Sequence, residues 1–216
     1  MKELSSQLEG IGEKIRTHLS TKDAAREKGI PRARDVIKYC ANAIRSAHRG
    51  EYDNAGKLLE TARALLDEIN SALKHHGDIF YVGVVHDAQK EYAEASITLA
   101  LVSGAALPDP DDLGVEYAAY LNGMGEAVGE LRRHLLDSLR KDDVSRCEEI
   151  LTYMDDMYNL LVTMDYPDAI TRGLRRTTDM VRGVLERTRG DLTIALRQDD
   201  LSKKLSSLRG RLERKK

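Results

Sequence analysis

Four glutamates have the residue type and spacing most suggestive of chemistry in this chain. Glu91 and Glu94 lie three residues apart, and Glu126 and Glu130 lie four apart. Residues at these spacings are neighbours on a helix, so each pair would bring like charges together. Two unit charges about 4 Å apart repel by roughly 4 kcal/mol at an effective dielectric near 20, so such a cluster needs a cation or protonation. Oxygen ligands select hard ions such as Mg²⁺, Mn²⁺ or Ca²⁺, and Mg²⁺ held by carboxylates can activate water against a phosphodiester.

The first pair of acids falls in a helix predicted over about residues 79–102. An apolar stripe with helical spacing runs along it and places Glu91 in its middle; its members are Val84, Ala88, Glu91, Ala95, Thr98 and Val102. Glu94 lies on the same side and fits a solvated face tolerably. A glutamate is almost never fully buried unless it is paired. Two interpretations of Glu91 therefore stay open, a metal ligand and a structural ion pair with an arginine.

The second pair falls in a helix predicted over about residues 113–140. Its core stripe lies on the opposite side and comprises Tyr117, Leu121, Met124, Val128, Leu131, Leu135 and Leu139. Taken alone, this pattern indicates that Glu126 and Glu130 face solvent. However, Gly123, Gly125 and Gly129 lie in the same helix, and each costs roughly 1 kcal/mol relative to alanine. We therefore expect another helix or a ligand to approach closely, and the acids to line a cavity.

The rest of the chain predicts an all-α fold of about seven helices in one bundle. Strand-like alternation is nearly absent. A helix is expected over about residues 2–20. Further along, a helix should break or kink at Gly29-Ile30-Pro31, with Pro31 in the first turn of the next helix. The other helices are expected over about residues 31–48, 53–75, 143–165 and 167–197. We predict one domain over residues 1–200 and a basic tail over 201–216, as a frayed helix or a disordered arm.

Composition narrows the function classes. The net charge is −2, with 32% charged and 41% hydrophobic residues, so a soluble protein is expected and the chain as a whole is not a basic nucleic-acid binder. No apolar run or signal-peptide pattern predicts a membrane segment, and a cytoplasmic location is expected by default. Cys40 and Cys147 form no metal-ligand spacing and are expected to be buried thiols.

Basic residues gather in the predicted second helix. Arg34, Lys38 and Arg45 share one helical face, and His48 and Arg49 follow. We predict that these five residues bind nucleic acid by tracking phosphates. An ordinary solvated face, or pairing with the buried acids, explains the same pattern, and both alternatives stay open.

Several short motifs resemble those of the translin and translin-associated factor X family. Gln89-Lys90-Glu91-Tyr92-Ala93-Glu94-Ala95 resembles its QEYVEA-type motif, and Gly125-Glu126-Ala127-Val128-Gly129-Glu130-Leu131 resembles its second acidic motif, D-L-T-G-E-L. Glu126 stands where the family commonly has aspartate. Ala47-His48-Arg49 is similar to the family's L-H-R, and Leu174-Arg175-Arg176 with Asp179 to its L-R-K/R…D pattern. The resemblance covers about residues 34–197.

The resemblance implies a Mg²⁺-dependent or Mn²⁺-dependent endoribonuclease, in which Glu91, Glu94, Glu126 and Glu130 bind the metal and carry catalysis. It also implies hollow homo-oligomers, often octamers, of an archaeal-like single-subunit form that enclose single-stranded or short duplex RNA, with single-stranded DNA as a further ligand. The alternative is a translin-like protein that binds nucleic acid without cutting it. A di-iron carboxylate bundle would need Glu-x-x-His motifs on paired helices, and none occurs at these acids.

Overall fold

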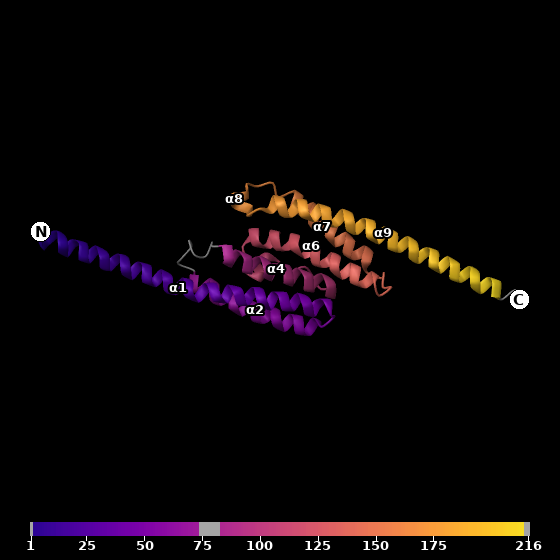
Figure 1. Cartoon of the computed structure of the whole chain (residues 1–216), viewed down its shortest axis with the longest axis horizontal. Coiled ribbons are helices and arrows are strands. Elements are labelled where there is room, and N and C mark those ends of the chain that lie inside the picture. The colour runs from indigo at the N-terminus through magenta and orange to yellow at the C-terminus, as the bar shows by residue number, and fades with distance from the viewer. Residues whose placement is uncertain (1, 74–82, 214–216) are drawn as a thin grey trace.

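A computed structural model describes residues 2–73 and 83–213 of the chain, and its fold over these residues is all-α, as predicted (Figure 1). The described ranges contain eight helices and no strand. In chain order these are α1 (Lys2–His48), α2 (Tyr52–Leu73), α4 (Gly83–Ser103), α5 (Pro110–Leu113), α6 (Tyr117–Leu139), α7 (Cys147–Val162), α8 (Asp168–Thr171) and α9 (Leu174–Glu213). The predicted end near residue 75 and start near residue 79 of two helices lie outside the described residues.

The helix α4 lies inside the bundle. It packs against α1, α2 and α6, and α6 in turn packs against α7 and α9. Consequently every residue from Tyr92 to Thr98 is buried, whichever side of α4 it lies on. The core contains Leu66, Ile69, Ile97, Met124, Leu131, Leu135, Ile150 and Met154. Cys40 and Cys147 are buried free thiols, as predicted. None of the helices in the described ranges is long and apolar enough to cross a bilayer.

The predicted break at Gly29-Ile30-Pro31 is wrong, because α1 runs without interruption through Pro31. A proline inside a helix removes one backbone hydrogen bond and costs about 3 kcal/mol. Packing on both sides offsets this cost. Before Pro31, Gly29 lies so near α2 that a Cβ atom there would stand 3.1 Å from Leu73 Cδ1. After Pro31, Ala33 and Val36 are fully buried.

Several other predicted helix bounds also need correction. The helix expected from residue 113 is divided, because Gly114 at φ 63° ends α5 and α6 begins at Tyr117. The last helix begins at Leu174, after Arg172 and Gly173, which both have positive φ. It then continues to Glu213, so the basic segment is helical over its described part and the predicted boundary at residue 200 falls inside α9.

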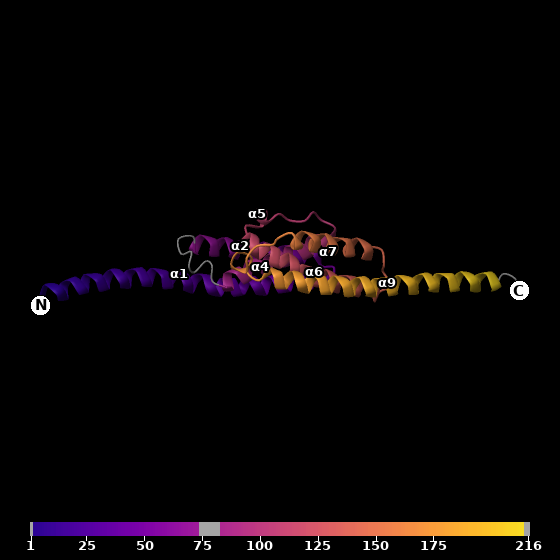
Figure 2. The ribbon, with the colours of Figure 1, turned by 90° about the horizontal axis from the view of Figure 1, so that it is seen from above.

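Two helical arms extend from opposite ends of the bundle, the first part of α1 and the last part of α9 (Figures 1 and 2). Large aliphatic side chains follow each arm at helical spacing and are 53% to 61% exposed. On α1 they are Leu4, Leu8, Ile11, Ile15 and Leu19, and on α9 they are Ile194, Leu201, Leu205, Leu208 and Leu212. Each arm therefore presents an apolar stripe that the chain's own described residues leave uncovered.

Candidate metal centre

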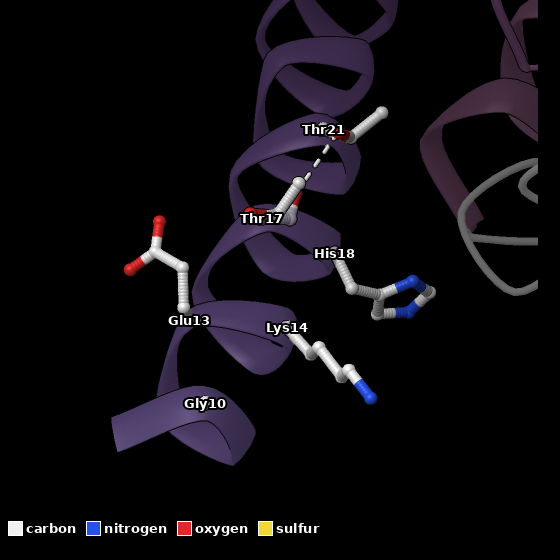
Figure 3. Close-up of a pocket in the computed structure, with 6 residues that line it drawn as sticks. All are labelled: Gly10, Glu13, Lys14, Thr17, His18 and Thr21. Carbon is white, nitrogen blue, oxygen red and sulfur yellow. Dashed lines mark hydrogen bonds between the residues drawn. The ribbon is translucent and has the colours of Figure 1, made fainter. Parts of the chain in front are cut away.

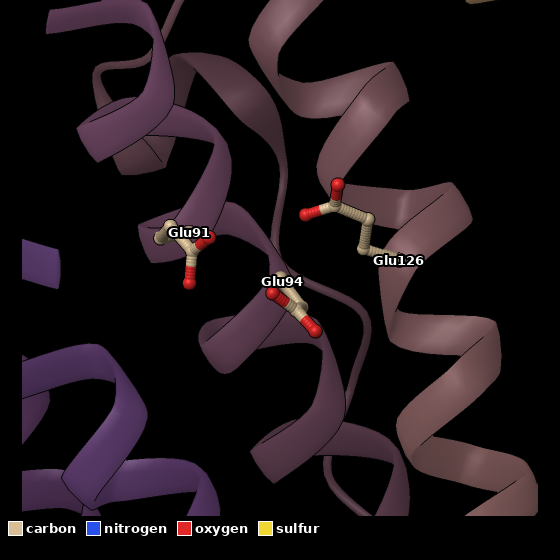
Figure 4. Close-up of side chains that lie close together, drawn as sticks. All are labelled: Glu91, Glu94 and Glu126. Atoms are coloured by element: carbon tan, nitrogen blue, oxygen red, sulfur yellow. The ribbon is translucent and has the colours of Figure 1, made fainter. Parts of the chain in front are cut away.

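Three of the four candidate glutamates meet between α4 and α6 (Figure 4). Glu91 and Glu94 come from α4 and Glu126 comes from α6. Each offers one ligand atom, and these atoms all lie within 4.8 Å of one another. The two sequence motifs, more than thirty residues apart, thus contribute to a single cluster of carboxylates, which we call the acidic triad.

Glycines allow α6 to approach its neighbours this closely. A Cβ atom at Gly123 would stand 2.5 Å from the carbonyl oxygen of Lys90 and 2.9 Å from the Cβ of Ala93. A Cβ atom at Gly125 would overlap the methyl group of Thr177 on α9. The expected close approach is therefore real at these two glycines. No described helix approaches Gly129, which is exposed and has open space around it.

The burial of the two acids on α4 is the reverse of the sequence-based expectation. Glu94 is buried, at 9% exposure, whereas the Glu91 side chain is 27% exposed. The prediction that Glu91 is the more deeply placed acid assumed that α4 has one buried face. In the structure α4 packs against α1, α2 and α6, so its burial is not confined to one face. The core stripe of α6 needs one similar correction, since Tyr117 at its start is 62% exposed.

Burial and mutual repulsion make the negative charge of the acidic triad unfavourable. Burial, reinforced by Glu91, Glu126 and Glu130, raises the pKa of Glu94 to about 8. Burial also raises the pKa of Glu91, although the neighbouring Lys90 opposes that rise. No hydrogen bond or ion pair reaches the Glu94 carboxylate from the described part of the chain. The triad therefore needs a proton or a cation at Glu94.

The nearest cation is a lysine, and not the arginine considered as a partner of Glu91. Lys90 Nζ lies 2.7 Å from Glu126 Oε1 and 3.9 Å from Glu91 Oε1. Burial is the largest single influence on Lys90 and disfavours its charged form, but the hydrogen bond to Glu126 and the attraction of the nearby carboxylates together outweigh it, so the pKa of Lys90 is raised. Lys90 is 20% exposed, so its ammonium group sits at the border between the triad and solvent.

Glu130 lies beside the acidic triad but has a partner of its own. His48, the last residue of α1, places Nε2 2.5 Å from Glu130 Oε2, and its side chain is only 5% exposed. This hydrogen bond lowers the pKa of Glu130. The ring of His48 also stacks on His134, with centroids 6.4 Å apart. The sequence grouped His48 with the basic residues, and the structure places it at the edge of the acidic site.

The remaining predicted nucleic-acid ligands lie on the surface of α1 and just beyond its end. Arg34, Lys38 and Arg45 are exposed, and Arg45 donates a hydrogen bond to Asn42 Oδ1 at 2.8 Å. Arg49 is also exposed and pairs with Glu51, Nε to Oε1, at 2.8 Å. Three cations thus remain on one helical face, while Arg49 is already neutralised by its neighbour.

A shallow hollow elsewhere on α1 is not a comparable site. All the residues that line it lie on successive turns of one helix, α1 (Figure 3). They are Gly10, Glu13, Lys14, Thr17, His18 and Thr21. Thr21 Oγ1 donates to the carbonyl oxygen of Thr17 within the helix. Since all its lining residues belong to the exposed arm, this hollow encloses no ligand.

Fold and site together define a class of protein, an all-helical bundle with a carboxylate cluster between its central helices. No protein-family model matches the sequence. Among solved structures, the chain is similar to AfC3PO in complex with duplex RNA, with 33% identity and a TM-score of 0.79, covering 85% of this chain and 95% of that one. AfC3PO alone gives the same identity and a TM-score of 0.78. The chain belongs to the translin/TRAX family, whose C3PO proteins these structures represent.

Two further proteins are similar to this chain at lower sequence identity. The structure of apo-NeC3PO shares 20% identity at a TM-score of 0.77 and covers 85% of this chain and 96% of that one, which shows the common fold. An uncharacterized protein of Methanocaldococcus jannaschii is 28% identical over 180 residues, covering 81% of this chain and 78% of the relative.

Proposed function

We propose that this protein is a metal-dependent endoribonuclease that binds RNA and hydrolyses its phosphodiester bonds at the acidic triad. The observation that carries the proposal is the meeting of Glu91, Glu94 and Glu126 within 4.8 Å from two helices. The related AfC3PO has been solved with duplex RNA, which supports RNA as the ligand. Acids that repel one another across a helix interface are unfavourable for folding, so a functional ligand accounts for them better than packing does.

The donor set fits Mg²⁺ or Mn²⁺. All its members are carboxylates, the oxygen ligands that these ions prefer. Glu91, Glu94 and Glu126 would hold the ion, and Glu130 would join from the edge. A bound ion of this kind supplies an activated water and charge neutralisation at the phosphodiester. Within the chain, Glu94 provides the buried anchor, and His48 keeps Glu130 ionised and oriented.

The exposed cations of α1 suit the phosphate backbone of RNA. Arg34, Lys38 and Arg45 lie on the helix whose last residue, His48, reaches the acidic site through Glu130. Cations on one helical face can follow successive phosphates without reading bases. The cations of α1 would therefore position the RNA, while the acidic triad acts on the phosphodiester bond.

We also propose that the protein works as a homo-oligomer, with an octamer as the assembly that the family resemblance implies. The uncovered stripe on the α1 arm supports association between copies. Acids and bases are balanced along this arm, namely Glu3, Glu9 and Glu13 against Lys2, Lys14 and Arg16. Such balance suits a second copy better than an anionic lipid surface, which favours helices rich in Lys and Arg.

The solution mass of the full chain tests this association. Leu8→Glu with Ile15→Glu places charge on the stripe and should lower the mass to that of a smaller assembly. Ser6→Glu with Thr17→Glu adds the same charge to other faces of the arm and should leave the mass unchanged. Equal masses for the two double variants would refute the role of the stripe.

Cleavage of labelled RNA tests the enzymatic proposal. Wild type should cut RNA with Mg²⁺ and stop when EDTA is added, and Glu91→Ala and Glu126→Ala should each abolish cutting. The competing function is RNA binding alone, and one observation favours it: Lys90 already pairs with Glu126, so part of the acidic charge is satisfied within the chain. Binding without cleavage by wild type would support this second function and exclude the first.

A further inference from the structure

The ammonium group of Lys90 lies beside the acidic triad, where it forms ion pairs with the carboxylates. It directly precedes Glu91 on α4, yet its ammonium group reaches across the helix interface and contacts Glu126 at 2.7 Å. It also lies 3.9 Å from Glu91. Among the described residues, it is the cation with ion pairs to two members of the triad.

The close approach of α4 and α6 fixes this position. Because Gly123 lies against the carbonyl oxygen of Lys90, the lysine backbone cannot move away from α6 without opening the interface. Its four-carbon stem is flexible, and the side chain is 20% exposed, so the ammonium group has a route to solvent. The backbone is thus held, whereas the charged end can leave.

We propose that Lys90 is a built-in counter-cation of the acidic triad, and that a divalent metal ion binds by displacing its ammonium group from Glu126. This inference rests on the proposed metal site. Glu126 cannot bind the ammonium group and a divalent ion at the same time without cost. A divalent ion held by the same carboxylates would lie close to the ammonium group and repel it. Lys90 therefore stabilises the metal-free protein and weakens its affinity for metal. Once displaced, it stays tethered next to the site.

The experiment measures Mn²⁺ affinity on the EDTA-stripped full chain. Lys90→Met keeps the length of the stem and removes the charge, so we expect Mn²⁺ to bind about tenfold more tightly than to wild type. Lys90→Arg keeps the charge and should bind no more tightly than wild type. Lys57→Met removes an exposed charge on α2 and should leave the affinity unchanged. Circular dichroism confirms that each variant is folded.

A second readout follows the ammonium group directly. Amine labelling read by mass spectrometry should show Lys90 reacting faster once Mn²⁺ is added, with Lys57 as the internal standard. Equal or weaker Mn²⁺ affinity in Lys90→Met, or labelling of Lys90 that does not rise, would overturn the displacement. If neither wild type nor Lys90→Met binds Mn²⁺, the metal site itself is wrong. Binding by Lys90→Met alone would support the displacement in its strongest form.

Discussion

The carbonyl oxygen of Lys90 lies against Gly123, in a space that a side chain at position 123 would occupy. A Cβ atom there would stand 2.5 Å from that oxygen, nearer than packed atoms approach. This contact sets the separation of α4 and α6 at the level of the acids. It thereby lets Glu126 on α6 meet Glu91 and Glu94 on α4, so a residue without a side chain determines the geometry of the site.

Replacing Gly123 should therefore disturb both stability and the site. Alanine normally stabilises a helix by about 1 kcal/mol over glycine. At position 123, however, overpacking against the backbone of α4 should produce a net loss of about 2 kcal/mol in the free energy of unfolding. Gly129→Ala is the matched control, because open space surrounds that residue. There the substitution should raise the free energy of unfolding by the full amount that alanine gains over glycine in a helix. Urea unfolding measures both, and similar effects of the two substitutions would contradict the tight contact.

The raised pKa of Glu94 predicts an unusual pH dependence for the metal-free protein. The unfolded chain releases this proton near pH 4.5, whereas the folded chain keeps it until about pH 8, so the folded state binds more protons between these values. The stability contributed by Glu94 is thus fully present below the lower value and is lost as pH rises through the higher one. In EDTA, the melting temperature of wild type should fall more steeply than that of Glu94→Gln between about pH 5 and pH 9. Parallel curves would show that Glu94 titrates normally.

The sequence predicted the all-helical fold, and three of the four candidate acids meet in the structure. It did not predict which of Glu91 and Glu94 is more deeply buried. Periodicity identifies a helix with one buried face, and α4 is buried on every side, so the pattern around Glu91 and Glu94 was uninformative about which acid lies deeper. Lys90 was missed for a different reason. Its role depends on the distance between two helices, which no spacing along the chain encodes.

Proline and histidine show the same limit in other parts of the chain. Pro31 carries a strong local signal for a helix break, and tertiary packing around Gly29 and Ala33 overrides it. His48 follows a run of basic residues in sequence, and only the fold brings it to Glu130 on α6. In both cases contacts between residues far apart in the sequence decided the outcome.

The exposed cations of α1 should make RNA binding depend on salt. Substituting Arg34, Lys38 and Arg45 together by glutamine should weaken binding and lower the slope of log K against log salt concentration by about 2, if each contacts one phosphate of a single strand. A triple control removes the same charge elsewhere at Lys57, Arg140 and Lys141. Binding titrations at several salt concentrations measure the slope, and an unchanged slope in the α1 variant would exclude this face.

The central claim is that the acidic triad cuts RNA, and Glu94 tests it most directly because it is the buried member without a partner in the described chain. The measurement is the single-turnover cleavage rate of labelled RNA in Mg²⁺ by wild type, Glu94→Gln and the exposed control Glu60→Gln. We predict that Glu94→Gln cuts about 100-fold more slowly or not at all, while it binds RNA as wild type does and the control keeps its rate. Equal cleavage by wild type and Glu94→Gln would contradict the account.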